Sequence, residues 1–201
     1  MVSIVRKYAS ENSEKDDIHG FLHIERVFNL SLQLGKQLGA NLLVLKIAAL
    51  LHDIGRINRN KTSSDKNHAQ LSSKMALEFL KPNDFTLSPE EIDNIIQSIR
   101  THSFSNNEIP QSLEAKILSD ADKLDALGAI GLYRTIGFTI KNQGGVKEVI
   151  KHLDNKIMKL KDQMYLDISK QIAVERHQIV LDFYNKLKEE ILEEKIIRVL
   201  K

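Results

Sequence analysis

Residues 42–55, with the sequence Leu-Leu-Val-Leu-Lys-Ile-Ala-Ala-Leu-Leu-His-Asp-Ile-Gly, decide the fold. Except for Lys46 the first ten are apolar, which predicts a helix over Leu42–Ile54 that is buried on every side and stopped by the final glycine. The segment carries a histidine and an aspartate, His52 and Asp53, at its end. Burying two such groups is costly unless a partner satisfies them. A divalent cation is one such partner, and a structural His–Asp ion pair is the alternative.

The rest of the chain is expected to be helical as well, because its apolar residues recur at spacings of three and four. A stripe of Leu22, Val27, Leu30 and Leu34 predicts a helix that ends at Gly35 or Gly39. A loop is expected over Gly55–Asn67, and the later helices are expected over His68–Leu80, Pro89–Thr101, Leu113–Ile136, Val146–Leu160 and Ile168–Leu200, the last with a break. Ser88 is expected to cap the helix that begins at Pro89. The sequence therefore predicts an all-α protein.

Length and composition limit the classes of protein. The 201 residues, 42% of them hydrophobic and 28% charged, favour one compact domain over 1–201. A net charge of +2, with 29 basic and 27 acidic residues, provides no large field for nucleic acid or anionic lipid. Nucleic-acid binding is therefore disfavoured. The longest apolar run is too short to span a membrane and the N-terminus lacks a secretory pattern, so a cytoplasmic protein is expected.

The absence of cysteine restricts any metal site to histidine and carboxylate ligands. His23 lies four residues before Val27 and so shares the inward face of its helix, although a structural core histidine is the common alternative. Asp122 has Leu118 one turn before it and Ala126 one turn after it, which makes it the best inward carboxylate of its helix.

Two neighbouring aspartates are expected to have other roles. Asp120 shares a face with lysines and is expected to be solvated, whereas Asp125 could orient a ligand. The candidate ligand set is therefore His23, His52, Asp53 and Asp122. Two imidazoles and two carboxylates suit Mn²⁺, Fe²⁺, Co²⁺, Ni²⁺, Zn²⁺ or Mg²⁺ and leave positions open for water and substrate.

The ordered set of motifs HIERV (23–27), AALLHDIG (48–55) and SDADKLDALGA (119–129) resembles the HD-domain superfamily of metal-dependent phosphohydrolases. The resemblance is to the small stand-alone bacterial and archaeal subgroup, and it runs from about residue 16 to 190. It implies a single multi-helix HD-type bundle. It also implies metal ligation by His23, His52, Asp53 and Asp122, the set that the helix faces indicate.

His68 and His102 lie near the places where dinuclear relatives have further histidines. Ligation of a second metal, contact with the substrate and a structural role all stay open for both. The resemblance also has departures. Arg56 stands where HD nucleoside monophosphatases have the glutamate of HDxxE, which disfavours that substrate class and leaves the general base unassigned. The Gly-Tyr-Pro of cyclic-dinucleotide phosphodiesterases and the Glu-Asp pair of alarmone hydrolases are absent.

Four basic residues near these motifs are candidates for holding phosphate, although each is also explained as a surface charge: Arg26, Arg56, Lys123 and Arg134. Asp53 and Asp122 would serve catalysis through the metal, and Arg56 and Lys123 would balance charge on the phosphoryl group in the transition state.

The expected function is hydrolysis of a phosphoanhydride or phosphoester bond in a small phosphorylated substrate, a nucleotide, by a metal-activated water. The alternative is a non-catalytic HD protein that binds metal or nucleotide and acts as a helical interaction or sensor module. No membrane partner is expected, and a homodimer is left open.

Overall fold

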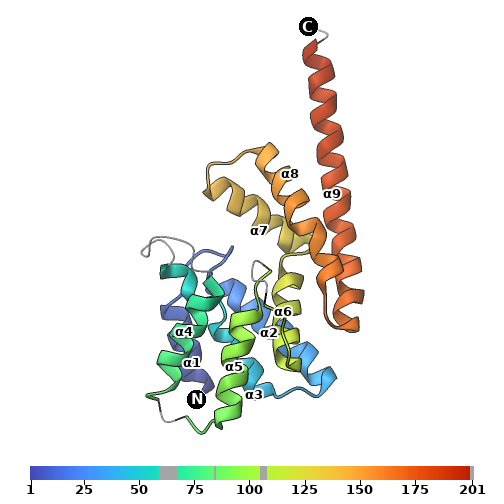
Figure 1. Cartoon of the computed structure of the whole chain (residues 1–201). Coiled ribbons are helices and arrows are strands. Elements are labelled where there is room, and N and C mark those ends of the chain that lie inside the picture. Colours follow the sequence, from blue (N-terminus) through green and yellow to red (C-terminus); the bar gives the residue numbers. More distant parts are fainter. Residues whose placement is uncertain (59–67, 84, 105–107, 200–201) are drawn as a thin grey trace. The chain divides into compact units, whose positions relative to one another are not determined.

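The computed structural model describes residues 1–58, 68–83, 85–104 and 108–199, with the side chains of all of these except residues 58 and 193–199. This described part of the chain is built from helices and contains no β-strand, which confirms the all-α prediction. The helices fall into two compact units, Met1–Asp125 and Ala126–Lys201, which are described in turn (Figure 1). The expectation of one domain over the whole chain stays a prediction.

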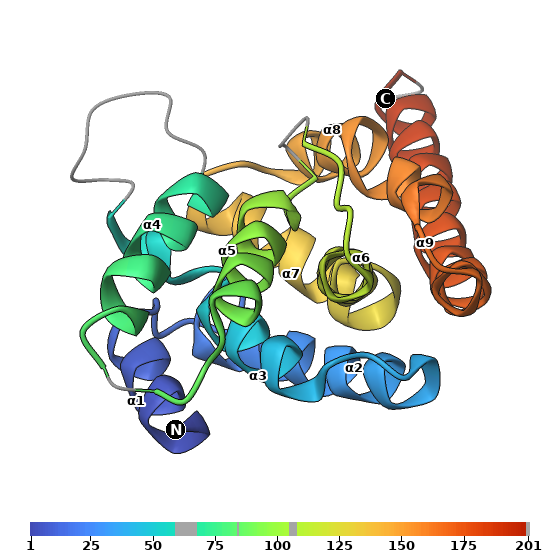
Figure 2. The same cartoon turned by 60° about the horizontal axis from the view of Figure 1, so that its bottom comes forward.

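The first unit is organised around α3, the apolar helix that opens the decisive segment. Its elements are α1 (Val2–Glu11), α2 (Phe21–Leu38), α3 (Leu42–Leu51), the 3₁₀ helix η1 (Ile54–Asn58), α4 (His68–Leu80), α5 (Pro89–Thr101) and α6 (Leu113–Asp125). Helix α3 packs against α1, α2, α5 and α6 (Figure 2). Seven of its ten side chains are buried, which confirms its predicted central place.

Polar contacts fix where the central helices begin. The Asn41 side chain caps α3 by accepting hydrogen bonds from the backbone N–H groups of Leu43 and Val44. The Glu114 carboxylate on α6 accepts hydrogen bonds from the Asn41 backbone N–H (2.7 Å) and from the Asn94 side-chain amide on α5 (2.9 Å). One buried carboxylate therefore ties α3, α5 and α6 together. The predicted cap at Ser88 is confirmed, since its side chain opens α5 with a capping box.

The segment after α3 differs from the expectation. The helix ends at Leu51 rather than Ile54, and residues 54–58 form η1 rather than a loop. The rest of the predicted loop, 59–67, lies outside the described residues. Gly55 is required here by close packing, because a Cβ at this position would lie 2.6 Å from the backbone nitrogen of Ser72 and 2.7 Å from the carbonyl oxygen of His68. The glycine brings η1 against α4.

Two features at the N-terminal side were predicted wrongly or missed. Helix α1 was not predicted, although Val5 and Ala9 are buried and lie four residues apart on its inner face. Leu22 was placed in the inward stripe of α2 but is 56% exposed, whereas Val27 and Leu34 of that stripe are buried. Of the two predicted ends of α2, Gly35 and Gly39, the helix ends at Gly39, which adopts a left-handed conformation with φ of 70°.

The second unit contains α7 (Gly128–Lys141), α8 (Val146–Asn155), the 3₁₀ helix η2 (Ile157–Gln163) and α9 (Asp167–Val199). The single helix predicted over Leu113–Ile136 is wrong, because α6 ends at Asp125 and α7 begins at Gly128, whose φ is 71°. The helix predicted over Val146–Leu160 also divides, into α8 and η2. Helix α9 has no break, contrary to expectation, and continues past α8 in Figure 1.

Candidate metal centre

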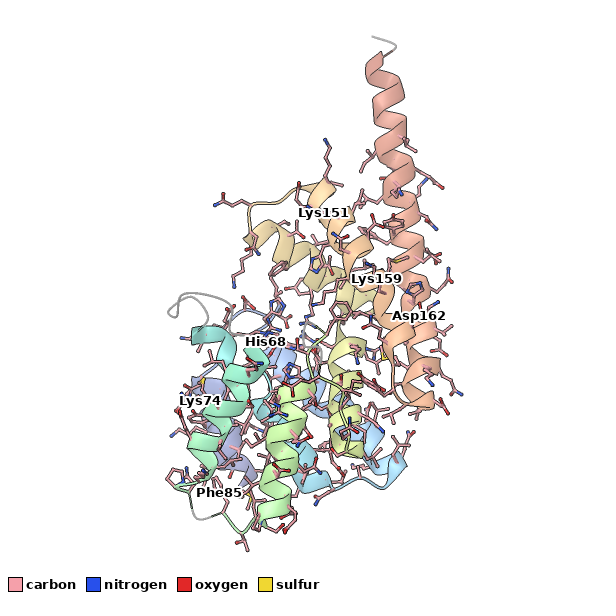
Figure 3. The ribbon with its side chains drawn as sticks, in the orientation of Figure 1. His68, Lys74, Phe85, Lys151, Lys159 and Asp162 are labelled. Atoms are coloured by element: carbon pink, nitrogen blue, oxygen red, sulfur yellow. The ribbon has the colours of Figure 1, made fainter. Side chains whose placement is uncertain are left out.

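The ends of several helices of the first unit bring histidines and aspartates together. His23 lies on α2, while His52 and Asp53 directly follow α3. His68, which is labelled in Figure 3, is the first residue of α4, and His102 directly follows α5. Asp122 and Asp125 lie on α6. The packing of these helices around α3 therefore brings seven residues from separate parts of the sequence into one cluster.

Asp53 stands in the middle of this cluster. Its Oδ2 atom lies 3.5 Å from Nε2 of His23 and 3.8 Å from Nε2 of His52. Its Oδ1 atom lies 3.5 Å from Nε2 of His68 and 3.6 Å from Nε2 of His102. One carboxylate therefore faces four imidazoles, two at each of its oxygen atoms.

Asp122 completes the cluster on the side of His23. Its Oδ1 lies 3.3 Å from Nε2 of His23, and that nitrogen lies 3.4 Å from Nε2 of His52. The Asp122 side chain is 19% exposed, while the side chains of His23, His52 and Asp53 are fully buried. The four predicted ligands are thus brought together, and the cluster reaches solvent at Asp122.

Hydrogen bonds at the far side of three rings determine which nitrogen faces the cluster. Nδ1 of His52 contacts the carbonyl oxygen of Ala49 at 2.8 Å, and Nδ1 of His102 contacts that of Ile99 at 2.6 Å. Since a carbonyl only accepts, both rings donate through Nδ1. Nδ1 of His23 lies 2.8 Å from Oδ2 of Asp125, another acceptor. In the neutral rings, Nε2 therefore presents its lone pair to the cluster, as a metal ligand does.

The polar atoms in the centre fit a cation. Oδ1 of Asp53 and Nε2 of His102 are buried and have no hydrogen-bond partner among the described residues. A buried polar group without a partner is costly, and a cation would satisfy both atoms. In the described part of the chain, two overlapping sets bring one donor atom per residue within 4.8 Å of one another: His23, His52 and Asp53, and Asp53, His68 and His102.

The electrostatics keep these groups in the states that metal ligation needs. Burial lowers the pKa of His52 to about 4 and that of His68 to about 2, so both rings are neutral near pH 7. Burial alone would raise the pKa of Asp53, but the Arg56 guanidinium and His52 outweigh it and hold that pKa well below the usual range. Burial opposes ionisation of Asp122 too, and the contact with His23 lowers its pKa instead.

Arg56 and Lys123 are placed differently with respect to the cluster. The Arg56 Nε donates to Oδ2 of Asp53 at 2.5 Å, and its Nη2 donates to Nε2 of His68 at 3.2 Å. Lys123 is buried, and its Nζ donates to the Ser119 hydroxyl at 2.8 Å. Of the two, Arg56 touches the candidate ligands directly.

Arg26 lies beside the cluster and contacts carboxylates. Its Nε donates to Oδ1 of Asp125 at 2.8 Å, and its other two nitrogens bind Asp17. Arg134 lies on α7 of the second unit, so a substrate contact for it stays a prediction. The other proposed substrate contacts, by His68 and His102, also stay predictions.

Asp120 corrects the sequence-based view of α6. It was expected to be solvated, but it is fully buried, with the Lys123 ammonium 3.7 Å from its Oδ1. The pair of opposite charges three residues apart resembles a surface pair in the sequence, whereas burial makes it part of the interior. The ring centroid of His19 lies 6.4 Å from that of His23.

A helical fold that gathers histidines and aspartates around a His-Asp dipeptide is the hallmark of one class of protein, the HD domain. The HD-domain model matches residues 20–127, more than half of the chain, and the protein belongs to this family. Among its relatives is the protein YpgQ of Bacillus subtilis, which is 30% identical over 181 residues that cover 86% of this chain and 84% of YpgQ.

Solved structures give the same answer. The crystal structure of YpgQ in complex with ADP matches with a TM-score of 0.74 at 27% identity over 94% of both chains. A structure from Lactobacillus plantarum matches with a TM-score of 0.78 at 26% identity, over 96% of this chain and 97% of its own. An HD-superfamily hydrolase from Bacillus thuringiensis matches with a TM-score of 0.70 at 27% identity, over 94% and 95%. The HD-type fold is therefore confirmed.

None of the helices in the described part of the chain has the length and apolar character needed to traverse a bilayer.

Proposed function

We propose that the protein is a metal-dependent phosphohydrolase that cleaves a phosphoanhydride or phosphoester bond of a small nucleotide. The observation that carries the proposal is the cluster around Asp53, in which four imidazole Nε2 atoms lie 3.5–3.8 Å from one buried carboxylate. His23, His52, Asp53 and Asp122 would hold the cation, and His68 and His102 would hold a second ion or contact the substrate. A structural ion pair would not need four imidazoles.

The chemistry follows from the donor set. A divalent cation bound there would supply a Lewis acid for a phosphoryl oxygen and lower the pKa of a water molecule from about 15.7 toward 7. Asp53 and Asp122 would fix its position with their carboxylates. Asp122 is the partly exposed member, so the substrate would approach from its side.

Arg56 would stabilise the negative charge of the reacting phosphoryl group. Its side chain is 19% exposed and its guanidinium lies against Asp53, so it can reach an anion bound at the same place. Lys123 is a weaker candidate, because its Nζ is buried against Ser119. Arg134 is a further candidate for binding the substrate phosphates.

The nucleotide class is supported by a relative. YpgQ, which shares the fold over 94% of this chain, was crystallised with ADP. We transfer that ligand class to this protein as part of the proposal. The balanced charge of 29 basic and 27 acidic residues fits a small substrate better than a polyanion.

The test is metal analysis combined with a nucleotide panel. The purified protein is assayed with Mn²⁺ and Co²⁺ for release of phosphate and pyrophosphate, beside Asp53→Ala and the control Asp93→Asn, which changes an exposed aspartate of α5. We expect activity in the wild type and the control, and loss of metal and activity in Asp53→Ala. A wild type that binds metal but cleaves no nucleotide would favour the non-catalytic sensor instead.

A further inference from the structure

We propose that Arg26 and Asp125 are positioning residues, which lock the ring of His23 with its Nε2 toward the metal and which do not contact the substrate. The inference rests on the proposed function in one respect, that His23 is a metal ligand. It replaces the expectation that Arg26 binds phosphate.

Asp125 is placed to hold His23 in one orientation. Its side chain is 3% exposed, and its two carboxylate oxygens face two different donors. Oδ2 accepts from Nδ1 of His23 at 2.8 Å, and Oδ1 accepts from Nε of Arg26 at 2.8 Å. Because each oxygen has a donor, the carboxylate cannot turn without breaking a charge-assisted hydrogen bond.

All three guanidinium nitrogens of Arg26 have a hydrogen-bond partner. Nε binds Asp125, Nη1 binds the carboxylate of Asp17, and Nη2 donates to the backbone oxygen of Asp17 at 3.0 Å. The three nitrogens therefore bridge α6 and the segment that precedes α2. Binding a phosphate would require Arg26 to leave a carboxylate that is almost fully buried.

The two residues act on the metal only through His23. Nε2 of that ring lies 3.3 Å from Asp122 and 3.5 Å from Asp53, and the Nδ1–H···Oδ2 bond fixes this direction. A carboxylate that accepts from the far nitrogen of a ligating histidine fixes its tautomer and raises its basicity. Without Arg26, the buried Asp125 carboxylate would lose its balancing charge, and its hold on His23 would loosen.

Asparagine at position 125 makes a sharp test, because it retains the size of the side chain but has only one oxygen. That oxygen can satisfy His23 or Arg26, and the amide N–H₂ then faces the other donor. We expect Asp125→Asn to weaken Mn²⁺ binding about 10- to 100-fold, and Arg26→Gln to weaken it about tenfold. The double variant is expected to bind Mn²⁺ no more weakly than the weaker-binding single variant, since both changes act on the same series of contacts to His23.

Two arginine variants serve as controls. Arg26→Lys keeps the positive charge but lacks the fork that spans Asp125 and Asp17, so it should behave like Arg26→Gln. Arg6→Gln removes the ion pair between Arg6 and Glu25. Glu25 lies next to Arg26 on α2, so this variant removes a neighbouring ion pair that does not involve Asp125. It should leave metal affinity unchanged. Thermal unfolding of each variant shows that it is folded before metal is added.

The experiment has two readouts besides activity. Calorimetry gives the Mn²⁺ affinity, and ¹H–¹⁵N spectra of the metal-free protein give the His23 tautomer, which should be Nδ1–H in the wild type and mixed in Asp125→Asn. At saturating Mn²⁺ the KM for the nucleotide should change less than about twofold in Arg26→Gln, since this residue makes no substrate contact.

The opposite pattern would overturn the inference. If Arg26→Gln raised the KM tenfold and left metal affinity and tautomer unchanged, Arg26 would be a phosphate ligand. A wild type without metal affinity would contradict the proposed function, and the tautomer measurement would still decide whether Asp125 and Arg26 orient His23.

Discussion

Replacing Gly55 by alanine should loosen the contact between η1 and α4 and disturb the cluster. The new Cβ would lie 2.6 Å from the backbone nitrogen of Ser72, 2.7 Å from the carbonyl oxygen of His68 and 2.9 Å from the Ser72 hydroxyl. Since two of these atoms belong to the backbone, α4 must shift. Overpacking of this kind costs about 1–3 kcal/mol, and loss of the Gly55 N–H hydrogen bond to Ser72 adds about 0.5–1.5 kcal/mol.

The assay is thermal unfolding followed by metal titration. For a chain of this length, about 1.5–4.5 kcal/mol corresponds to a Tm lowered by about 3–18 °C. The matched control is Gly39→Ala, where a Cβ meets nothing within 4 Å and only the φ of 70° opposes alanine, at about 1–2 kcal/mol. Gly39→Ala should bind Mn²⁺ normally, whereas Gly55→Ala should bind it more weakly because His68 moves. A Gly55→Ala protein that melts within about 1 °C of wild type would refute the close-packing argument.

Three further outcomes are expected. Asp53→Asn should weaken Mn²⁺ binding more than about 100-fold in calorimetry. Mutating a residue that only hydrogen-bonds to a ligand lowers metal affinity about 10- to 100-fold, and loss of a ligand itself should lower it further. An unchanged affinity would show that Asp53 is not a ligand. Glu114→Ala should lower the free energy of unfolding in urea by about 2–4 kcal/mol, since it leaves the Asn41 N–H and the Asn94 amide without their acceptor; a loss below about 0.5 kcal/mol would contradict this. Mn²⁺ at 100 times its Kd should stabilise the wild type by about 2.7 kcal/mol, and EDTA should abolish the rise in Tm; a Tm indifferent to both would argue against a native-state metal site.

The parts of the fold that the sequence predicts are those where local pattern and tertiary packing agree. Helix α3 is apolar almost throughout, so burial on all sides was the only packing available to it. Helix α5 begins at Ser88 because the cap and Pro89 are local signals. The ends of both helices lie within three residues of the predicted positions.

The errors arise where the helical spacing of apolar residues continues past the end of a helix. Ala121, Leu124 and Leu127 keep the spacing of one helix across the junction, although α6 ends at Asp125 and α7 begins at Gly128, which has a left-handed backbone. A glycine alone does not predict the end of a helix, because a helix tolerates glycine at a modest cost in stability. Helix α1 was missed since its ten residues carry several charges beside the buried Val5 and Ala9.

The candidate site divides in the same way. The faces of two helices and the end of the apolar helix predicted that His23, His52, Asp53 and Asp122 lie together, and the structure has them together. His68 and His102 were proposed as site residues only because of the family resemblance. The sequence of α4 or of α5 by itself does not predict which of their residues meet in the folded protein.

The C-terminal ends of α3 and α5 affect how strongly the cluster attracts cations. Each helix macrodipole places about half a negative charge at its C-terminus, and His52 and His102 both stand at such a terminus. The peptide backbone thus adds an attraction for positive ions that no side-chain substitution removes. Asp53→Asn should accordingly retain a weak residual affinity for cations, and neutralising every carboxylate in turn would expose how much of the attraction the main chain provides.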